Sequence, residues 1–331
     1  MEIPDWRSIG RHLRKRLDDI LDPTPREPPP SPSDRLTRRK EDAVLKGFVY
    51  FDNFEEVEVW SPEEVDPIQV SNIPLLSRSR SLRSIPPNNA SKSKILVCHD
   101  YKRGFNEYES ARPADSSHDE YSCEYLQYVD TFIYFSHKLV CCPPASWISL
   151  CHRNGVKILG TFIVEPQTPD IQRMLENENG SFWLASKLNT MAQALGFDGW
   201  LLNIEKSFPG DISTHELLLF IRYLRKEMGT EKAVIWYDAL NSDNKVKYQN
   251  GLTEKNIKFA EAAGTLFTNY KWTEKEARNA VDIAKRAGMR TEDIYFGVDV
   301  WAQNVDTDPP RITFPVEGGG GTSTGLVSSF Y

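Results

Sequence analysis

The sequence lacks both the long apolar runs of a membrane protein and the cysteine pattern of a small secreted domain. No stretch approaches the roughly 20 apolar residues needed to span a bilayer, and residues 1–20 contain no uninterrupted apolar segment of the kind found in signal peptides. The five cysteines are odd in number and irregularly spaced, which favours free thiols in a reducing compartment. These absences predict a soluble, cytosolic protein without a membrane partner.

The sequence also lacks an excess of positive charge, a metal-binding cluster and a phosphate loop. Its 40 Lys and Arg against 47 Asp and Glu give a net charge of −7, which argues against a nucleic-acid partner. His99 and His137 have no third clustered ligand, so no zinc site is expected. The glycine run 318–321 lacks the lysine of a phosphate loop and is interpreted as a mobile loop over a cleft. The 8 Trp and 13 Tyr suit a saccharide binder, but ordinary cores also use aromatic residues.

Composition divides the chain into three parts. Residues 1–44 are rich in Pro and Arg and predict a disordered tail; its basic run 35–40 is either a localisation signal or a solvated linker. Residues 45–93 form a lead-in that ends in a polar linker. Residues 94–331 alternate apolar runs with amphipathic stretches and are assigned to a single catalytic domain.

Seven short apolar runs in this domain predict parallel strands buried on both faces: 94–101, 130–137, 157–165, 199–205, 233–240, 264–272 and 293–301. Capping boxes beginning at Ser213 and Thr273 predict helices that end at Gly229 and Gly288. Alternating strands and helices at this spacing predict an α/β fold, a (β/α)8 TIM-type barrel. The count stops at about seven βα units, so the barrel is expected to be incomplete, with its eighth strand missing.

The segment most informative about chemistry is FDGWLLNIE, residues 197–205. Side chains alternate faces along a strand, so Asn203 and Glu205 share the inner face at the strand's carboxyl end, where barrel enzymes place their active sites. One carboxylic acid beside a carboxamide suits substrate-assisted cleavage of a 2-acetamido sugar. Asn203 would orient the acetamido group, and Glu205 would protonate the leaving oxygen. The alternative is that both residues form a polar layer inside the barrel.

This strand resembles the catalytic strand of glycoside hydrolase family 85, the endo-β-N-acetylglucosaminidases. Other segments similar to that family occur in the same order: LVCHD (96–100), YFSH (134–137), ILGTFIVE (158–165), IWYDAL (235–240), FTNYKW (267–272) and YFGVDVWA (295–302). The resemblance implies retaining hydrolysis between the two core GlcNAc residues of N-glycans through an oxazolinium intermediate, and also transfer of the glycan to acceptors other than water. It implies that Asn203 orients the acetamido group, that Glu205 acts as acid and then base, and that Tyr237 hydrogen-bonds the same group. No metal or organic cofactor is implied.

Further residues at or near the strands' carboxyl ends are predicted to bind the sugar: His99, Asp100, His137, Glu165, Trp236, Asn269, Tyr270, Trp272, Asp299 and Trp301. Trp272 and Trp301 would serve as stacking platforms or else pack at the rim. The expected partner is an N-glycan, free or on a glycoprotein, with no obligate protein partner.

Two alternatives stay open at this point. The first is an inactive, truncated glycan-binding paralogue, because the eighth strand is expected to be missing. The second is a chitinase-like family 18 hydrolase, because Asp198, Gly199 and Glu205 also fit the pattern DGxDxDxE, although Leu201 and Asn203 replace its two later aspartates.

Overall fold

The computed structural model describes residues 47–78, 93–100, 123, 125–210, 214–299 and 323–329. The chain divides into two units, Met1–Asp42 and Ala43–Tyr331, and every described residue belongs to the second. The predicted tail at 1–44, most of the polar linker, the glycine run 318–321 and Trp301 therefore lie outside the described residues.

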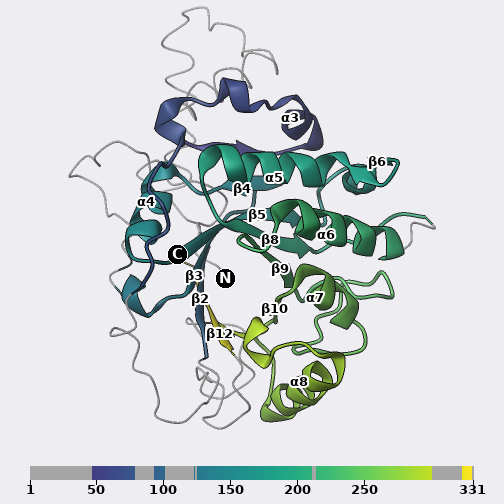
Figure 1. Cartoon of the computed structure of the whole chain (residues 1–331). Helices are drawn as coiled ribbons and strands as arrows, with labels where there is room; N and C mark the ends of the chain where they lie inside the picture. Colours follow the sequence, from purple (N-terminus) through teal and green to yellow (C-terminus); the bar gives the residue numbers. More distant parts are fainter. Residues whose placement is uncertain are drawn as a thin grey trace, which may run out of the picture. The chain divides into compact units, whose positions relative to one another are not determined.

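Eight parallel strands pair in a closed ring. The strands labelled β2, β3, β5, β8 and β9 lie near the centre of Figure 1. Each strand pairs in parallel with the next, and the last pairs with the first. This parallel ring consists of β2 (Ile95–Asp100), β3 (Thr131–Phe135), β5 (Lys157–Val164), β8 (Gly199–Ile204), β9 (Ala233–Tyr237), β10 (Leu266–Phe267), β11 (Ile294–Asp299) and β12 (Ser323–Ser329). The first seven confirm the strands predicted from the sequence.

The prediction that the eighth strand is missing is wrong. Residues 323–329, with the sequence STGLVSS, form β12, which pairs with β11 on one side and with β2 on the other. A strand held between two neighbours gains backbone hydrogen bonds along both edges, so it does not need a continuous apolar run. This segment contains only two large apolar residues, Leu326 and Val327, so it lacks the apolar run that predicts a buried strand.

Two antiparallel strands, one of them from the lead-in, extend the ring, so the whole sheet is mixed. Strand β1 (Val49–Phe51) pairs with β4 (Val140–Cys142), and β4 pairs with β5. Helix α3 (Phe54–Val59) follows β1 and begins at Asn53, whose side chain accepts a hydrogen bond from the Glu56 amide.

Five longer helices alternate with the strands of the ring: α4 (Ala145–Arg153), α5 (Trp183–Leu195), α6 (Thr214–Met228), α7 (Ile257–Ala263) and α8 (Glu274–Ala287). The capping box at Thr273 and the helix end at Gly288 are confirmed for α8. Helix α6 runs to Met228 and is followed by Gly229 at φ 69°, as predicted, while Ser213 lies outside the described residues. None of the helices that the structure describes has the length and apolar character that crossing a bilayer requires.

Short elements complete the described chain. The 3-10 helices are η1 (Pro62–Glu64), η2 (Pro67–Gln69), η4 (Leu126–Tyr128), η5 (Ile171–Leu175) and η6 (Thr291–Asp293). Strands β6 (Asn177–Glu178) and β7 (Ser181–Phe182) pair as a small separate hairpin.

Side-chain alternation along the strands separates two apolar layers. On β8, Trp200 and Leu202 belong to the large cluster between the ring and the helices, while Leu201 belongs to a small cluster inside the ring. Gly160 on β5 makes room for this packing, since a Cβ there would lie 2.8 Å from the Trp200 ring and 2.5 Å from the Cys141 carbonyl oxygen. The same alternation turns Asn203, two residues beyond Leu201, toward the inside.

Candidate active site

A cavity of about 150 Å³ opens at the carboxyl ends of the ring strands. Five strands and the residues that follow them line it: Cys98, Asp100, Phe135, His137, Leu201, Asn203, Glu205, Tyr237, Phe267 and Tyr270. The lining combines apolar side chains with one amide, two acids, two phenols and one imidazole, which is the mixture expected of a small polar-ligand site.

Asn203 and Glu205 meet at the centre of this lining. The Asn203 Nδ2 group donates to Glu205 Oε1 at 3.2 Å, and the Glu205 amide donates to the Val164 carbonyl at 2.7 Å, which continues the β5–β8 pairing as far as residue 205. Asn203 is 3% exposed, and its Oδ1 atom has no hydrogen-bond partner among the described residues. A buried carbonyl oxygen without a partner costs free energy, so this atom is an acceptor available to a ligand N–H group.

The environment of Glu205 favours its protonated form. Burial raises the pKa of its carboxyl group, and the negative charge of Glu165 adds to this rise. Hydrogen bonds from Asn203 and Tyr248 and the positive charge of His137 oppose it without reversing it. A carboxylic acid that keeps its proton longer than usual is suited to act as a general acid.

His137 lies between two carboxylates at the edge of the cavity. Its Nδ1 atom is 2.8 Å from Glu165 Oε1, and its Nε2 atom is 3.4 Å from Asp100 Oδ2. The hydrogen bond to Asp100 raises the pKa of His137 to about 9; burial opposes this rise and Glu165 reinforces it. His137 is therefore an imidazolium at neutral pH.

Tyr237 stands at the end of β9 with its hydroxyl inside the ring. The hydroxyl donates to Asn269 Oδ1 at 3.2 Å and lies 3.5 Å from the Tyr270 hydroxyl. Burial raises the pKa of Tyr237 well above its usual value, and Tyr270 contributes to the same shift. The phenol consequently keeps its proton and remains a hydrogen-bond donor.

Three residues predicted to bind sugar pack away from the cavity, against other parts of the protein. His99 stacks against Phe132 and Trp147 at 6.2 and 6.3 Å, and burial lowers its pKa to about 4. Trp236 packs on Phe259 at 4.8 Å.

Trp272 donates from Nε1 to the Gly297 carbonyl at 2.6 Å and packs edge-on against Phe296. His99 and Trp236 each sit one residue away from an inward-facing neighbour, so strand alternation turns them toward the helices.

The remaining predicted residues border the cavity. Glu165 and Asn269 contact the lining through His137 and Tyr237, while Asp299, at the end of β11, is close enough for its charge to raise the pKa of Tyr270. The structure thus brings together Asp100, His137, Glu165, Asn203, Glu205, Tyr237, Asn269, Tyr270 and Asp299.

Tyr248 was not predicted from the sequence. It lies in the loop between β9 and α7, its hydroxyl hydrogen-bonds Glu205, and its ring packs edge-on against Tyr237 at 6.3 Å. Asp238 holds this loop by accepting from the Gln249 and Asn250 amides at 2.9 and 2.6 Å. A loop tyrosine carries no periodicity, so no sequence pattern pointed to it.

No grouping in the described part of the chain suits a metal ion, since no three His, Cys, Asp or Glu side chains cluster there as ligands. Both ring nitrogens of His137 are directed at carboxylates of the protein itself.

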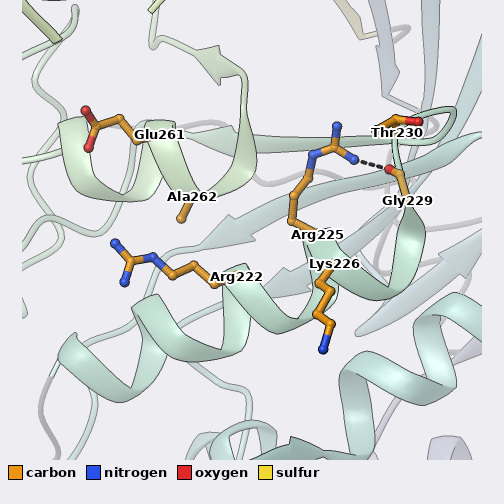
Figure 2. Close-up of a pocket in the computed structure, with 7 residues that line it drawn as sticks. All are labelled: Arg222, Arg225, Lys226, Gly229, Thr230, Glu261 and Ala262. Atoms are coloured by element: carbon orange, nitrogen blue, oxygen red, sulfur yellow. Dashed lines mark hydrogen bonds between the residues drawn. The ribbon is translucent and has the colours of Figure 1, made fainter. Parts of the chain in front are cut away.

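A larger hollow of about 490 Å³ lies between α6 and α7 (Figure 2). Figure 2 shows Arg225 turned back onto the Gly229 carbonyl, and the same guanidinium donates to the Lys232 carbonyl at 3.1 Å. These contacts occupy carbonyls that follow the end of α6, where cations are favourable. Because Lys232 directly precedes β9, this hollow lies toward the amino ends of the strands, away from Glu205.

The profile of glycosyl hydrolase family 85 matches residues 103–327. The chain is 34% identical over 261 residues to the cytosolic endo-beta-N-acetylglucosaminidase of Mus musculus, covering 77% of this chain and 34% of that protein. It is 36% identical over 256 residues to the protein of the same name from Danio rerio, covering 76% and 35%. The chain thus spans about a third of the length of these relatives.

A solved structure shares the fold. The glycoside hydrolase domain of Endo-D from Streptococcus pneumoniae R6 superposes with a TM-score of 0.68 at 23% identity, covering 85% of this chain and 46% of that one. The family match extends over more than half of the sequence and includes both Asn203 and Glu205. The chain belongs to glycosyl hydrolase family 85.

Proposed function

We propose that the chain is an endo-β-N-acetylglucosaminidase that hydrolyses the β-1,4 bond between the two core GlcNAc residues of N-glycans. The observation that carries this proposal is the Asn203–Glu205 pair, in which a buried amide oxygen without a partner among the described residues adjoins an acid whose pKa is raised. A 2-acetamido sugar offers the two groups this pair requires, an amide N–H and a glycosidic oxygen.

The proposed mechanism is retaining and substrate-assisted. The acetamido oxygen of the substrate attacks C1, while Glu205 donates its proton to the leaving glycosidic oxygen. Asn203 Oδ1 accepts the acetamido N–H, and the Tyr237 hydroxyl donates to the same group and aligns it. The oxazolinium intermediate is then opened by water, whose proton returns to Glu205. An acceptor hydroxyl in place of water gives transglycosylation.

The proposed scaffold is a complete (β/α)8 barrel. The closed cycle of eight parallel pairings supports this assignment, as does placement of the cavity at the carboxyl ends of the strands. The alternative of an inactive truncated paralogue depended on a missing eighth strand, and β12 removes that argument.

The proposed substrate is a free N-glycan or a glycoprotein. Asp100, Glu165, Asn269, Tyr270 and Asp299 are the proposed partners of the sugar hydroxyls, since they border the cavity and carry polar groups. A cytosolic location is proposed because the curated relatives bear that word in their names. No metal, organic cofactor or obligate protein partner enters this proposal.

Mass spectrometry of a high-mannose glycopeptide incubated with the purified chain tests the function. The expected product is a peptide that retains a single GlcNAc on asparagine, with none formed by Glu205→Gln. Intact glycopeptide after incubation with the folded wild-type chain would refute the proposed activity, and equal turnover by Glu205→Gln would refute the role of the acid.

A further inference from the structure

His137 connects two carboxylates that come from different strands of the ring. Asp100 ends β2, His137 follows β3, and Glu165 follows β5, which pairs with β3. The distances of 3.4 and 2.8 Å assign one ring nitrogen to each carboxylate. A neutral imidazole has a single N–H group, so only the doubly protonated ring donates to both.

Asp100 and His137 line the cavity, and Glu165 adjoins it through His137. The side chains of His137, Asp100 and Glu165 are 35, 21 and 19% exposed. Phe135 packs edge-on against the imidazole at 5.4 Å and limits its rotation. Each carboxylate uses one oxygen on His137; Glu165 Oε2 also accepts from Gln167 at 2.6 Å. Carboxylate oxygens directed at a cavity are acceptors of the kind that sugar hydroxyls need.

His137 differs in charge from the other polar residues around the cavity, which are acids, phenols or an amide. Its acidic neighbours are Asp100 and Glu165. Glu205, directly after β8, and the phenols of Tyr237 and Tyr270 also line the cavity, and Tyr248 hydrogen-bonds Glu205. Among the described residues that line the cavity, His137 is the only basic side chain. Nearby Lys138 is directed to Asp52 at 2.9 Å instead.

We propose that His137 is a positioning residue, whose doubly protonated ring donates to both Asp100 and Glu165 and holds them as a two-carboxylate seat for glycan hydroxyls. This inference rests on the proposed function and deepens it by assigning a recognition device beside the catalytic pair. Without the imidazolium, two carboxylates of like charge would face the same small space with no donor between them, and their repulsion would move them out of position. The seat would then lose its geometry, and binding would weaken more than the chemical step.

Steady-state kinetics of His137→Gln and His137→Lys on the high-mannose glycopeptide test the proposal. At pH 7 we expect His137→Gln to raise KM about tenfold with a smaller change in kcat, as for one lost charge-assisted contact. His137→Lys, which keeps the charge and N–H donors, should recover most of the KM. His215→Gln is the matched control, because His215 is exposed on α6 and does not line the cavity.

The pH profile separates this role from a merely structural one. In the wild type KM should rise as pH passes about 9, where His137 loses its proton, and this rise should be absent in His137→Gln. An unchanged KM in His137→Gln, or equal defects in the Gln and Lys variants, would overturn the proposal. If His137→Gln is insoluble, the wild-type profile decides: a KM that stays flat through pH 9 overturns it.

Binding measurements distinguish failure of this inference from failure of the proposed function. Calorimetry with the same glycopeptide compares Glu205→Gln with the double variant Glu205→Gln/His137→Gln. Weaker binding by the double variant supports the positioning role even if the wild type forms no product, which would refute the function alone. Equal affinity refutes the positioning role whatever the activity.

Discussion

The two ends of the parallel ring each contain a histidine beside an acid. Only at the amino ends does every polar atom of the group have a hydrogen-bond partner among the described residues. At the amino ends, His152 Nε2 lies 2.8 Å from Asp198 Oδ2, and its Nδ1 contacts the Ile73 carbonyl. Asp198 also accepts from the Ile158 amide at 2.9 Å. Every polar atom named here has a partner within the chain.

At the carboxyl ends, the polar groups converge on a cavity. Asn203 Oδ1 has no partner among the described residues, and His137 is more exposed than His152, at 35% against 5% for the side chains. Residue type therefore does not distinguish structure from function here. The distinction lies in whether the hydrogen-bonding capacity is used up by the protein or left for a ligand.

The largest expected effect is loss of catalysis at the carboxyl end. Glu205→Gln removes the transferable proton and should lower kcat by roughly 10²–10⁴-fold, the usual contribution of general acid–base catalysis. The melting temperature should stay close to that of the wild type, because the amide can still accept from Asn203. A large drop in melting temperature would mean that Glu205 stabilises the fold. It would contradict the view that the carboxyl end serves catalysis and the amino end serves stability.

The opposite result is expected at the amino end. Asp198→Asn removes the charge that His152 and the Ile158 amide share, and should lower the free energy of unfolding by about 2 kcal/mol. Below the melting transition, KM and kcat should remain near wild type. Urea unfolding followed by circular dichroism measures the first quantity, and the glycopeptide assay measures the second. A selective loss of kcat with unchanged stability would contradict the comparison.

The protonated histidines at both ends of the ring should make the stability of the fold decrease at alkaline pH. Burial disfavours the charged form of His152, but the bonds to Asp198 and Ile73 raise its pKa overall, and the pKa of His137 is raised to about 9. The stability from these histidines is fully present below about pH 6.5, the ordinary value, and is lost as pH rises through the folded-state pKa. Melting temperature should therefore fall between pH 6.5 and 9.5, and His137→Gln should reduce the slope. A flat profile would argue against the protonated pairs.

The smallest expected effect concerns Tyr248. Tyr248→Phe keeps the ring beside Tyr237 but removes the hydrogen bond that lowers the pKa of Glu205. The basic limb of the pH–rate profile should therefore move to higher pH, with kcat changed by no more than about fivefold, the scale of one neutral hydrogen bond. A shift of the limb to lower pH would show that Tyr248 does not stabilise the carboxylate.

Sequence patterns predicted the strands well because parallel strands buried on both faces are continuous apolar runs. They predicted the Asn203–Glu205 pair because strand alternation is strict. The same rule, applied to His99 and Trp236, would have turned both toward the helices; position near a strand's end was too weak a criterion. Strand β12 and Tyr248 could not be predicted, since pairing on two edges fixes the first and the Asp238-held loop places the second.

Closure of the ring by β12 has a consequence for how the chain folds. Strand β2 begins at Ile95 and its partner β12 at Ser323, so this pairing joins segments far apart in sequence. Contacts of such long range carry a large loop-closure entropy and slow folding. During synthesis, the edges of β2 and β11 that pair with β12 remain unpaired until residues 323–329 have left the ribosome. Unpaired strand edges can pair with other chains. We therefore expect the yield of folded protein in the cell to depend on how well these two edges are protected until β12 has formed.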